Sequence, residues 1–113
     1  MAIGSKAAKY DIIIEQGEDY RLDISLDKNS ADLNITDIDF EAAHKPNYGA
    51  TTSTPFSVVK LNNATGQISL QMAHAETTKL ASGVGVYDLW MYNDSQWVRL
   101  LQGTCTVRPA VYK

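Results

Sequence analysis

The stretch "QWVRLLQGTCTVRP", residues 96–109, alternates apolar and polar side chains but changes step in the middle. Val98 and Leu100 occupy even positions, whereas Cys105 and Val107 occupy odd ones. One face of a strand can hold all four only if a residue is inserted between the two pairs. A glycine within a strand pattern usually marks a β-bulge, so we expect the bulge at Gly103 and a final strand that bends there or passes between sheets.

The residues before this strand predict its partner. "VYDLWMY", residues 86–92, also alternates, and the connecting "NDSQ", residues 93–96, has the composition of a tight turn. With Asp94 and Ser95 at the centre of the turn, the hairpin sets three pairs opposite one another: Tyr92 and Trp97, Trp90 and Arg99, and Met91 and Val98.

Alternation recurs along the rest of the chain, most clearly in "DYRLDISL", residues 19–26. "YDIIIE" at 10–15 is apolar on both faces, which suggests burial between layers or contact with a neighbour, and "AHAETTKLASG" at 73–83 predicts a helix of about two turns. About seven strands at this spacing predict an all-β fold, an immunoglobulin-like antiparallel β-sandwich with one short helix. The predicted core consists of Tyr20, Leu22, Ile24, Phe40, Ile68, Leu70, Leu89, Val98, Leu100, Cys105 and Val107.

The length of 113 residues corresponds to one domain that can bury a sizeable core. Residues 1–9 have small side chains and no periodicity, which predicts a flexible N-terminal arm that becomes ordered on a neighbour. The sandwich domain is then expected to span residues 10–113.

Charge and apolar runs limit the possible partners. The chain has 13 acidic and 10 basic residues, a balance with no electrostatic footprint for nucleic acid or an anionic membrane. The start lacks the apolar run of a secretory signal, and no stretch is long enough for a membrane span. We therefore expect protein partners and neither nucleic acid nor membrane. The single cysteine, Cys105, excludes an internal disulfide and is expected in the core.

Residue patterns for catalysis or cofactor binding are missing. His44 and His74 have no second ligand at a zinc spacing, and neither a phosphate-binding glycine loop nor a nucleophile elbow is recognisable. Acidic side chains alternate on two strands, which leaves calcium as an alternative to a solvated strand face; these are Asp37, Asp39, Glu41, Asp19 and Asp23. We expect no enzyme activity, no cofactor and no metal.

The predicted hairpin gathers aromatic residues and an arginine on its outer face. Such a composition is typical of protein-binding hot spots, although loops or the N-terminal segment could instead cover it. A stacking platform for carbohydrate is the alternative function. The predicted interface residues are Trp90, Tyr92, Trp97, Arg99 and Leu101.

Several segments together resemble small immunoglobulin-like virion proteins of tailed bacteriophages, including the N-terminal domain of baseplate upper proteins. They are "YDIIIEQGEDYRLDISL", "ADLNITDIDFEAAHKP", "TGQISLQMAHAETTKL", "GVYDLWMY" and "RLLQGTCTVRP". At "LNIT", residues 33–36, the chain departs from the family's usual Leu-Thr-Gly.

The resemblance implies a structural protein, assembled in the host cytoplasm and present in the virion as a homo-oligomer or in several copies. It implies docking onto other virion proteins as a tail or baseplate adaptor. Decoration of the head is the alternative location.

Overall fold

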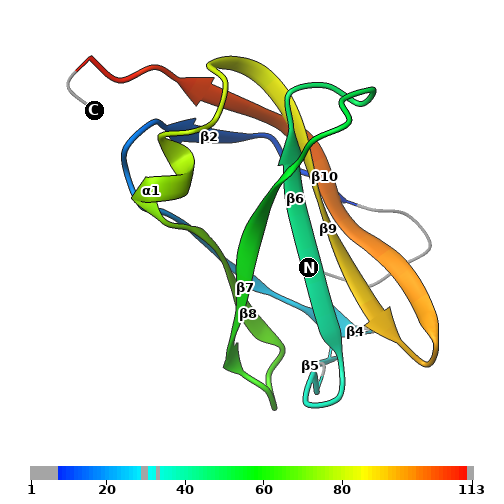
Figure 1. Ribbon diagram of the computed structural model, residues 1–113. Helices are drawn as coiled ribbons and strands as arrows, with labels where there is room; N and C mark the ends of the chain where they lie inside the picture. The colour runs from blue at the N-terminus through cyan, green and yellow to red at the C-terminus, as the bar shows by residue number, and fades with distance from the viewer. Residues whose placement is uncertain (1–7, 29–30, 33, 112–113) are drawn as a thin grey trace.

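The computed structural model describes residues 8–28, 31–32 and 34–111 of the chain, and these form an all-β immunoglobulin-like sandwich with one short helix (Figure 1). The elements in chain order are β1 (Ala8–Lys9), β2 (Ile12–Glu15), β3 (Tyr20–Ser25), β4 (Asp27–Lys28), β5 (Ala31–Asp32), β6 (Asp39–Lys45), β7 (Thr54–Asn62), β8 (Gln67–Met72), α1 (His74–Thr77), β9 (Gly83–Asn93) and β10 (Gln96–Arg108). Among the described residues, no helix is long and apolar enough to span a membrane.

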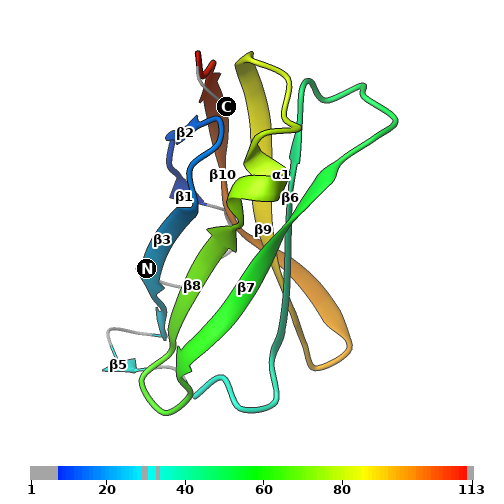
Figure 2. The same ribbon diagram turned by 60° about the vertical axis from the view of Figure 1, so that its left-hand side comes forward.

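Strand β7 belongs to both layers of the sandwich. Its first residues, 54–56, pair with β6, and residues 57–62 pair with β8. One layer therefore has the order β10, β9, β6 and β7, with β1 and β2 running parallel to β10 at its edge. The other layer has the order β7, β8 and β3. Figure 2 shows β7 diverging from β6 as it crosses to the second layer.

The core lies between these two layers, and most of the predicted core residues lie in it. Ile24, Ile68, Leu70, Leu89, Leu100, Cys105 and Val107 are buried, as predicted. Four other predicted members pack against the core but are only partly buried: Tyr20, Leu22, Phe40 and Val98. The triple isoleucine is buried on one face only, because Ile12 and Ile14 point inward whereas Ile13 is 55% exposed.

The bulge in β10 lies at Leu100, so the prediction that placed it at Gly103 is wrong. Arg99 pairs with Trp90, and Leu101 pairs with Leu89, which leaves Leu100 as the extra residue. Both leucines are buried, with exposed fractions of 3% and 2%. The change of step inferred from the sequence exists, but two successive inward-facing leucines produce it.

Gly103 lies where the connection between β1 and β2 passes very close to β10. A Cβ at this position would lie 2.3 Å from the carbonyl oxygen of Tyr10 and 2.9 Å from Oδ1 of Asp11. The amide of Tyr10 donates a hydrogen bond to the carbonyl oxygen of Gln102 at 2.9 Å. Only glycine lets the connection between β1 and β2 cross β10 at this distance.

The helix is shorter than predicted, and the structure describes the last two residues of the predicted N-terminal arm. Helix α1 has four residues, less than the predicted two turns, and the chain then leads Leu80 into the core. The buried hydroxyl of Thr77 donates to the carbonyl oxygen of Glu18 at 2.8 Å, which fixes the helix to the turn between β2 and β3. Ala8 and Lys9 form β1, which pairs with β10. Residues 1–7 lie outside the described part of the chain.

Candidate protein-binding face

The turn between β9 and β10 positions the predicted interface residues. Asp94 and Ser95 have φ values of 53° and 61°, as in two-residue hairpin turns of the type that matches strand twist. All three predicted cross-strand pairs occur. Trp90, Tyr92, Trp97 and Arg99 consequently project from the outer side of the sheet, and we call the surface that they form the aromatic face.

Leu101 does not belong to the aromatic face. The bulge at Leu100 reverses the side on which the following residues point, so Leu101 turns inward and is 2% exposed. Its predicted place on the outer face depended on the bulge lying at Gly103. Gln102 occupies the outward position instead, next to Arg99.

The guanidinium of Arg99 is held by three neighbours. Its Cζ lies 4.8 Å from the centre of the Trp90 ring, the cation–π contact that the predicted pairing implies. Its Nη1 donates to Oε1 of Gln102 at 2.6 Å, and its Nε lies 3.8 Å from Oδ2 of Asp88. These contacts hold the guanidinium over the indole before any partner binds. The Arg99 side chain nevertheless remains 40% exposed.

Tyr92 and Trp97 form the end of the aromatic face that is nearest the turn. Their ring centres are 4.8 Å apart and their planes are inclined at 47°. Trp97 is 49% exposed, one of the large apolar side chains that remain in solvent. Burial of an aromatic side chain of this size against a partner makes a large favourable contribution to the free energy of binding.

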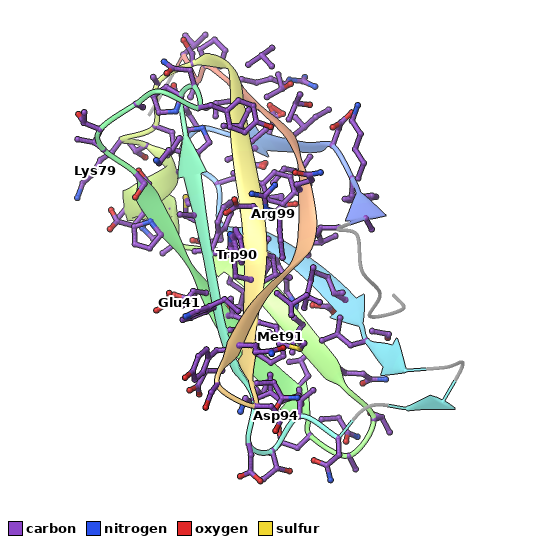
Figure 3. The ribbon with its side chains drawn as sticks, turned by 90° about the vertical axis from the view of Figure 1, so that its right-hand side faces the viewer. Glu41, Lys79, Trp90, Met91, Asp94 and Arg99 are labelled. Atoms are coloured by element: carbon purple, nitrogen blue, oxygen red, sulfur yellow. The ribbon has the colours of Figure 1, made fainter. Side chains whose placement is uncertain are left out.

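Strand β6 contributes side chains that sequence reasoning did not assign to this face. Glu41 pairs with Trp90, Asp39 pairs with Tyr92, and Ala43 pairs with Asp88. The alternation of residues 35–44 predicts that Asp39 and Glu41 point outward, but not that β6 lies beside β9. Figure 3 shows Glu41, Trp90 and Arg99 on three neighbouring strands of the outer face.

A hollow of about 430 Å³ borders Trp90 at the point where β7 leaves β6. Its walls combine aromatic, aliphatic and acidic side chains, which are those of Phe40, Glu41, Ala42, Ala43, Pro55, Phe56, Asp88 and Trp90. The hollow forms a depression beside the aromatic face, into which a side chain of a partner can fit.

The other outer surface of the sandwich is more polar. There, Arg21 and Asp23 form an exposed ion pair on β3, and Gln71 donates to Ser69 on β8. Val59 on β7 is exposed at this side, but without aromatic neighbours of the kind that β9 and β10 supply. The two faces therefore differ in composition, and the aromatic face is the one suited to burial against a partner.

Asp19 and His74, two of the candidate chemical groups, contact each other at the start of helix α1. Asp19 accepts hydrogen bonds from the backbone amide of His74 at 2.7 Å and pairs with its Nδ1 at 2.9 Å. No local pattern indicates this pairing, because the two residues are 55 positions apart. The bond to the amide lowers the pKa of Asp19 and occupies a free N–H at the start of α1. Both side chains are exposed, and the contact is that of a helix cap.

The second histidine and the cysteine are buried. His44 is 2% exposed, and its Nε2 has no hydrogen-bond partner in the described part of the chain. Burial lowers the pKa of His44, and burial raises the pKa of the Cys105 thiol to about 12. A neutral, inaccessible thiol fits the predicted core role of Cys105. Within residues 8–28, 31–32 and 34–111, no group of three acidic, histidine or cysteine side chains could hold a metal ion.

Comparison with known proteins supports the fold. Neither a protein family nor a curated protein matches the sequence. The structure is similar to the N-terminal domain of phage TP901-1 ORF48, with a TM-score of 0.59 and 8% identity over 95% of this chain and 94% of that one.

Two further structures share less of the architecture. One is Listeria monocytogenes InlP, with a TM-score of 0.48 and 13% identity over 90% of this chain and 28% of that one. The other comes from a study of multimeric cell-adhesive interactions of VGSC beta subunits, with a TM-score of 0.47 and 14% identity over 90% and 92%. At these identities the similarity concerns the fold alone.

Proposed function

We propose that the chain is a non-enzymatic structural protein of a bacteriophage virion, where it docks onto other virion proteins as an adaptor of the tail or baseplate. The observation that carries the proposal is the aromatic face. Partly exposed aromatic rings and a preorganised arginine, beside a hollow, are the composition of a protein-binding hot spot. The fold shared with the N-terminal domain of phage TP901-1 ORF48 favours a phage protein as the context for this face.

Three features support a binding role over catalysis. Asp19 accepts a hydrogen bond from the first amide of α1, Cys105 is buried, and His44 is almost entirely buried. The aromatic face is suited to recognition of a partner. Its cation, Arg99, is fixed in position by a hydrogen bond to Gln102 and by its contact with the Trp90 ring. The chain is proposed to assemble in the host cytoplasm and to occur in several copies in the particle.

A carbohydrate-binding module is the second candidate, because Trp90, Tyr92 and Trp97 share one sheet face. Sugar rings stack best on an uncovered aromatic plane. Here Arg99 lies over the Trp90 ring, and the other two rings are inclined at 47° to each other. This arrangement favours a protein partner. Binding to a glycan array that Trp97→Ala abolishes would support the second candidate instead.

The experiment for the proposed function is mass spectrometry of purified particles of the phage that encodes the chain, separated into tails and heads. We expect the chain in the tail fraction, in a constant ratio to the other tail proteins. Its presence in heads alone would favour the alternative of head decoration. Its absence from both fractions would refute a role in the virion.

A further inference from the structure

Three residues of the outer sheet form a row whose charges run from basic to acidic. Arg99 on β10 pairs with Trp90 on β9, and Trp90 pairs with Glu41 on β6. The row therefore contains a cation, an aromatic ring and an acid on adjacent strands, and Figure 3 shows the three residues in this order across the sheet. Strand spacing puts the backbones of Arg99 and Glu41 about 10 Å apart, with Trp90 midway.

Both ends of this row are accessible to a partner. The Arg99 side chain is 40% exposed, although it donates to Gln102 and lies 3.8 Å from Asp88, so a partner's acid can still approach the guanidinium. Among the residues that the structure describes, the carboxylate of Glu41 has no hydrogen-bond or ion-pair partner. A partner surface that fits this row must offer an acid to Arg99, an apolar group to Trp90 and a base to Glu41.

We infer that the partner of the aromatic face is the aromatic face of a second copy of this chain, related by a two-fold axis parallel to β9. The inference rests on the proposed function, because it takes this face as the docking surface, with a second copy of the chain as the virion protein that docks there. Such an axis keeps the row in place and reverses its order, so that Arg99 faces the partner's Glu41 and Glu41 faces the partner's Arg99. The two Trp90 side chains then meet at the axis, each with its own Arg99 guanidinium against the ring.

The neighbouring row has the same self-complementarity. Trp97, Tyr92 and Asp39 lie side by side on β10, β9 and β6. After the two-fold rotation, Trp97 faces the partner's Asp39, and an indole N–H can donate to a carboxylate. Asp88 lies near the axis and would face the partner's Asp88, but Arg99 of its own chain compensates its charge.

The dimensions of this sheet fit a small, weak dimer interface. Strand β9 has 11 residues, which corresponds to about 37 Å, and it lies between the 13 residues of β10 and the 7 residues of β6, whereas β7 adds only residues 54–56 to this layer. Three strands span about 14 Å, so the footprint is at most about 530 Å² per copy, at the low end of the range for transient interfaces. Exposed Val84 on β9 and Ile13 on β2 extend the apolar surface beyond the aromatic face.

Sedimentation velocity of the 113-residue chain from about 1 µM to about 1 mM tests this inference. The variants are Glu41→Arg and Arg99→Glu, studied alone and as an equimolar mixture. Asp23→Arg on the opposite face of the sandwich is the control, because it is a similar change at an exposed position. Circular dichroism melts establish that each variant is folded.

The wild type should dimerise, and each variant alone should do so at least about tenfold more weakly, because like charges then face each other across the axis. The mixture should form a heterodimer, since the Glu41→Arg chain has a base at both ends of the row and the Arg99→Glu chain has an acid at both ends. Asp23→Arg should behave as the wild type.

A wild type that stays monomeric, a mixture no better than its components, or an equal loss in Asp23→Arg would overturn the inference. None of these results bears on whether the chain is found in virions, which decides the proposed function separately.

Discussion

Replacement of Gly103 by alanine tests how the N-terminal strands are attached to the sandwich. The added Cβ would lie 2.3 Å from the carbonyl oxygen of Tyr10 and 2.8 Å from its carbonyl carbon. Both atoms belong to the backbone, so the contact cannot be relieved by rotating a side chain. We expect the segment between β1 and β2 to move away from β10.

The expected magnitude follows from the contacts that this movement breaks. Three hydrogen bonds depend on the crossing: Tyr10 N–H to the Gln102 carbonyl oxygen, Thr104 N–H to Asp11 Oδ1, and the Tyr87 hydroxyl to the Tyr10 carbonyl oxygen. Each contributes a net 0.5–1.5 kcal/mol, as an order of magnitude. Gly103→Ala should therefore lower the free energy of unfolding by about 2–4 kcal/mol, in the range expected for overpacking.

Urea denaturation followed by circular dichroism measures this change, and amide hydrogen exchange at Tyr10 and Thr104 localises it. Gly49→Ala is the control, because a Cβ there would meet only the side chain of Asn47, at 3.5 Å. Its stability should differ from that of the wild type by less than about 0.5 kcal/mol. An equally small effect of Gly103→Ala, with unchanged exchange at Tyr10, would refute the close crossing as the reason for this glycine.

Three other predictions concern the core, the helix and pH. Leu89→Ala should cost about 2–5 kcal/mol in urea melts, and Leu22→Ala less, because Leu89 is fully buried and Leu22 only partly; equal costs would contradict this. Thr77→Val should cost about 1–3 kcal/mol by leaving backbone groups of the β2–β3 turn unpaired, whereas the exposed Thr78→Val should cost less; a neutral Thr77→Val would contradict the anchoring role. Because burial lowers the pKa of His44 from 6.5, the unfolded chain binds the proton more readily, and stability should fall as pH drops below 6.5. An NMR titration of His44 with a midpoint above 6.5 would contradict this.

The hairpin was predictable because its turn and its alternation are local. Asp94 and Ser95 mark the turn, and counting outward from them gives the Trp90–Arg99 and Tyr92–Trp97 pairs that the structure contains. Local counting also identifies seven residues that are buried in the core. The presence of the bulge was evident for the same reason, because parity must change between Leu100 and Cys105.

The position of the bulge was not predictable from glycine alone. Gly103 is required for a contact with Tyr10, more than 90 residues away in the sequence, and no local pattern reveals such a contact. The adjacent leucines at 100 and 101 were the better signal, since both are apolar in a strand that otherwise alternates. The same limit applies to Glu41, whose place beside Trp90 depends on the order of strands in the sheet.

Incorporation of variants into particles tests the central claim, that the aromatic face is the docking surface, most directly. Trp97→Ala removes a half-exposed side chain and should leave the thermal melting temperature of the isolated chain nearly unchanged. Val59→Ala, at an exposed position of the other layer, is the matched control. Truncation of an aromatic hot-spot residue costs about 2 kcal/mol or more of binding. We predict that Trp97→Ala is depleted from purified particles by at least about tenfold while Val59→Ala is incorporated as the wild type. Normal incorporation of a folded Trp97→Ala, together with loss of Val59→Ala, would contradict the claim and assign docking to the opposite face.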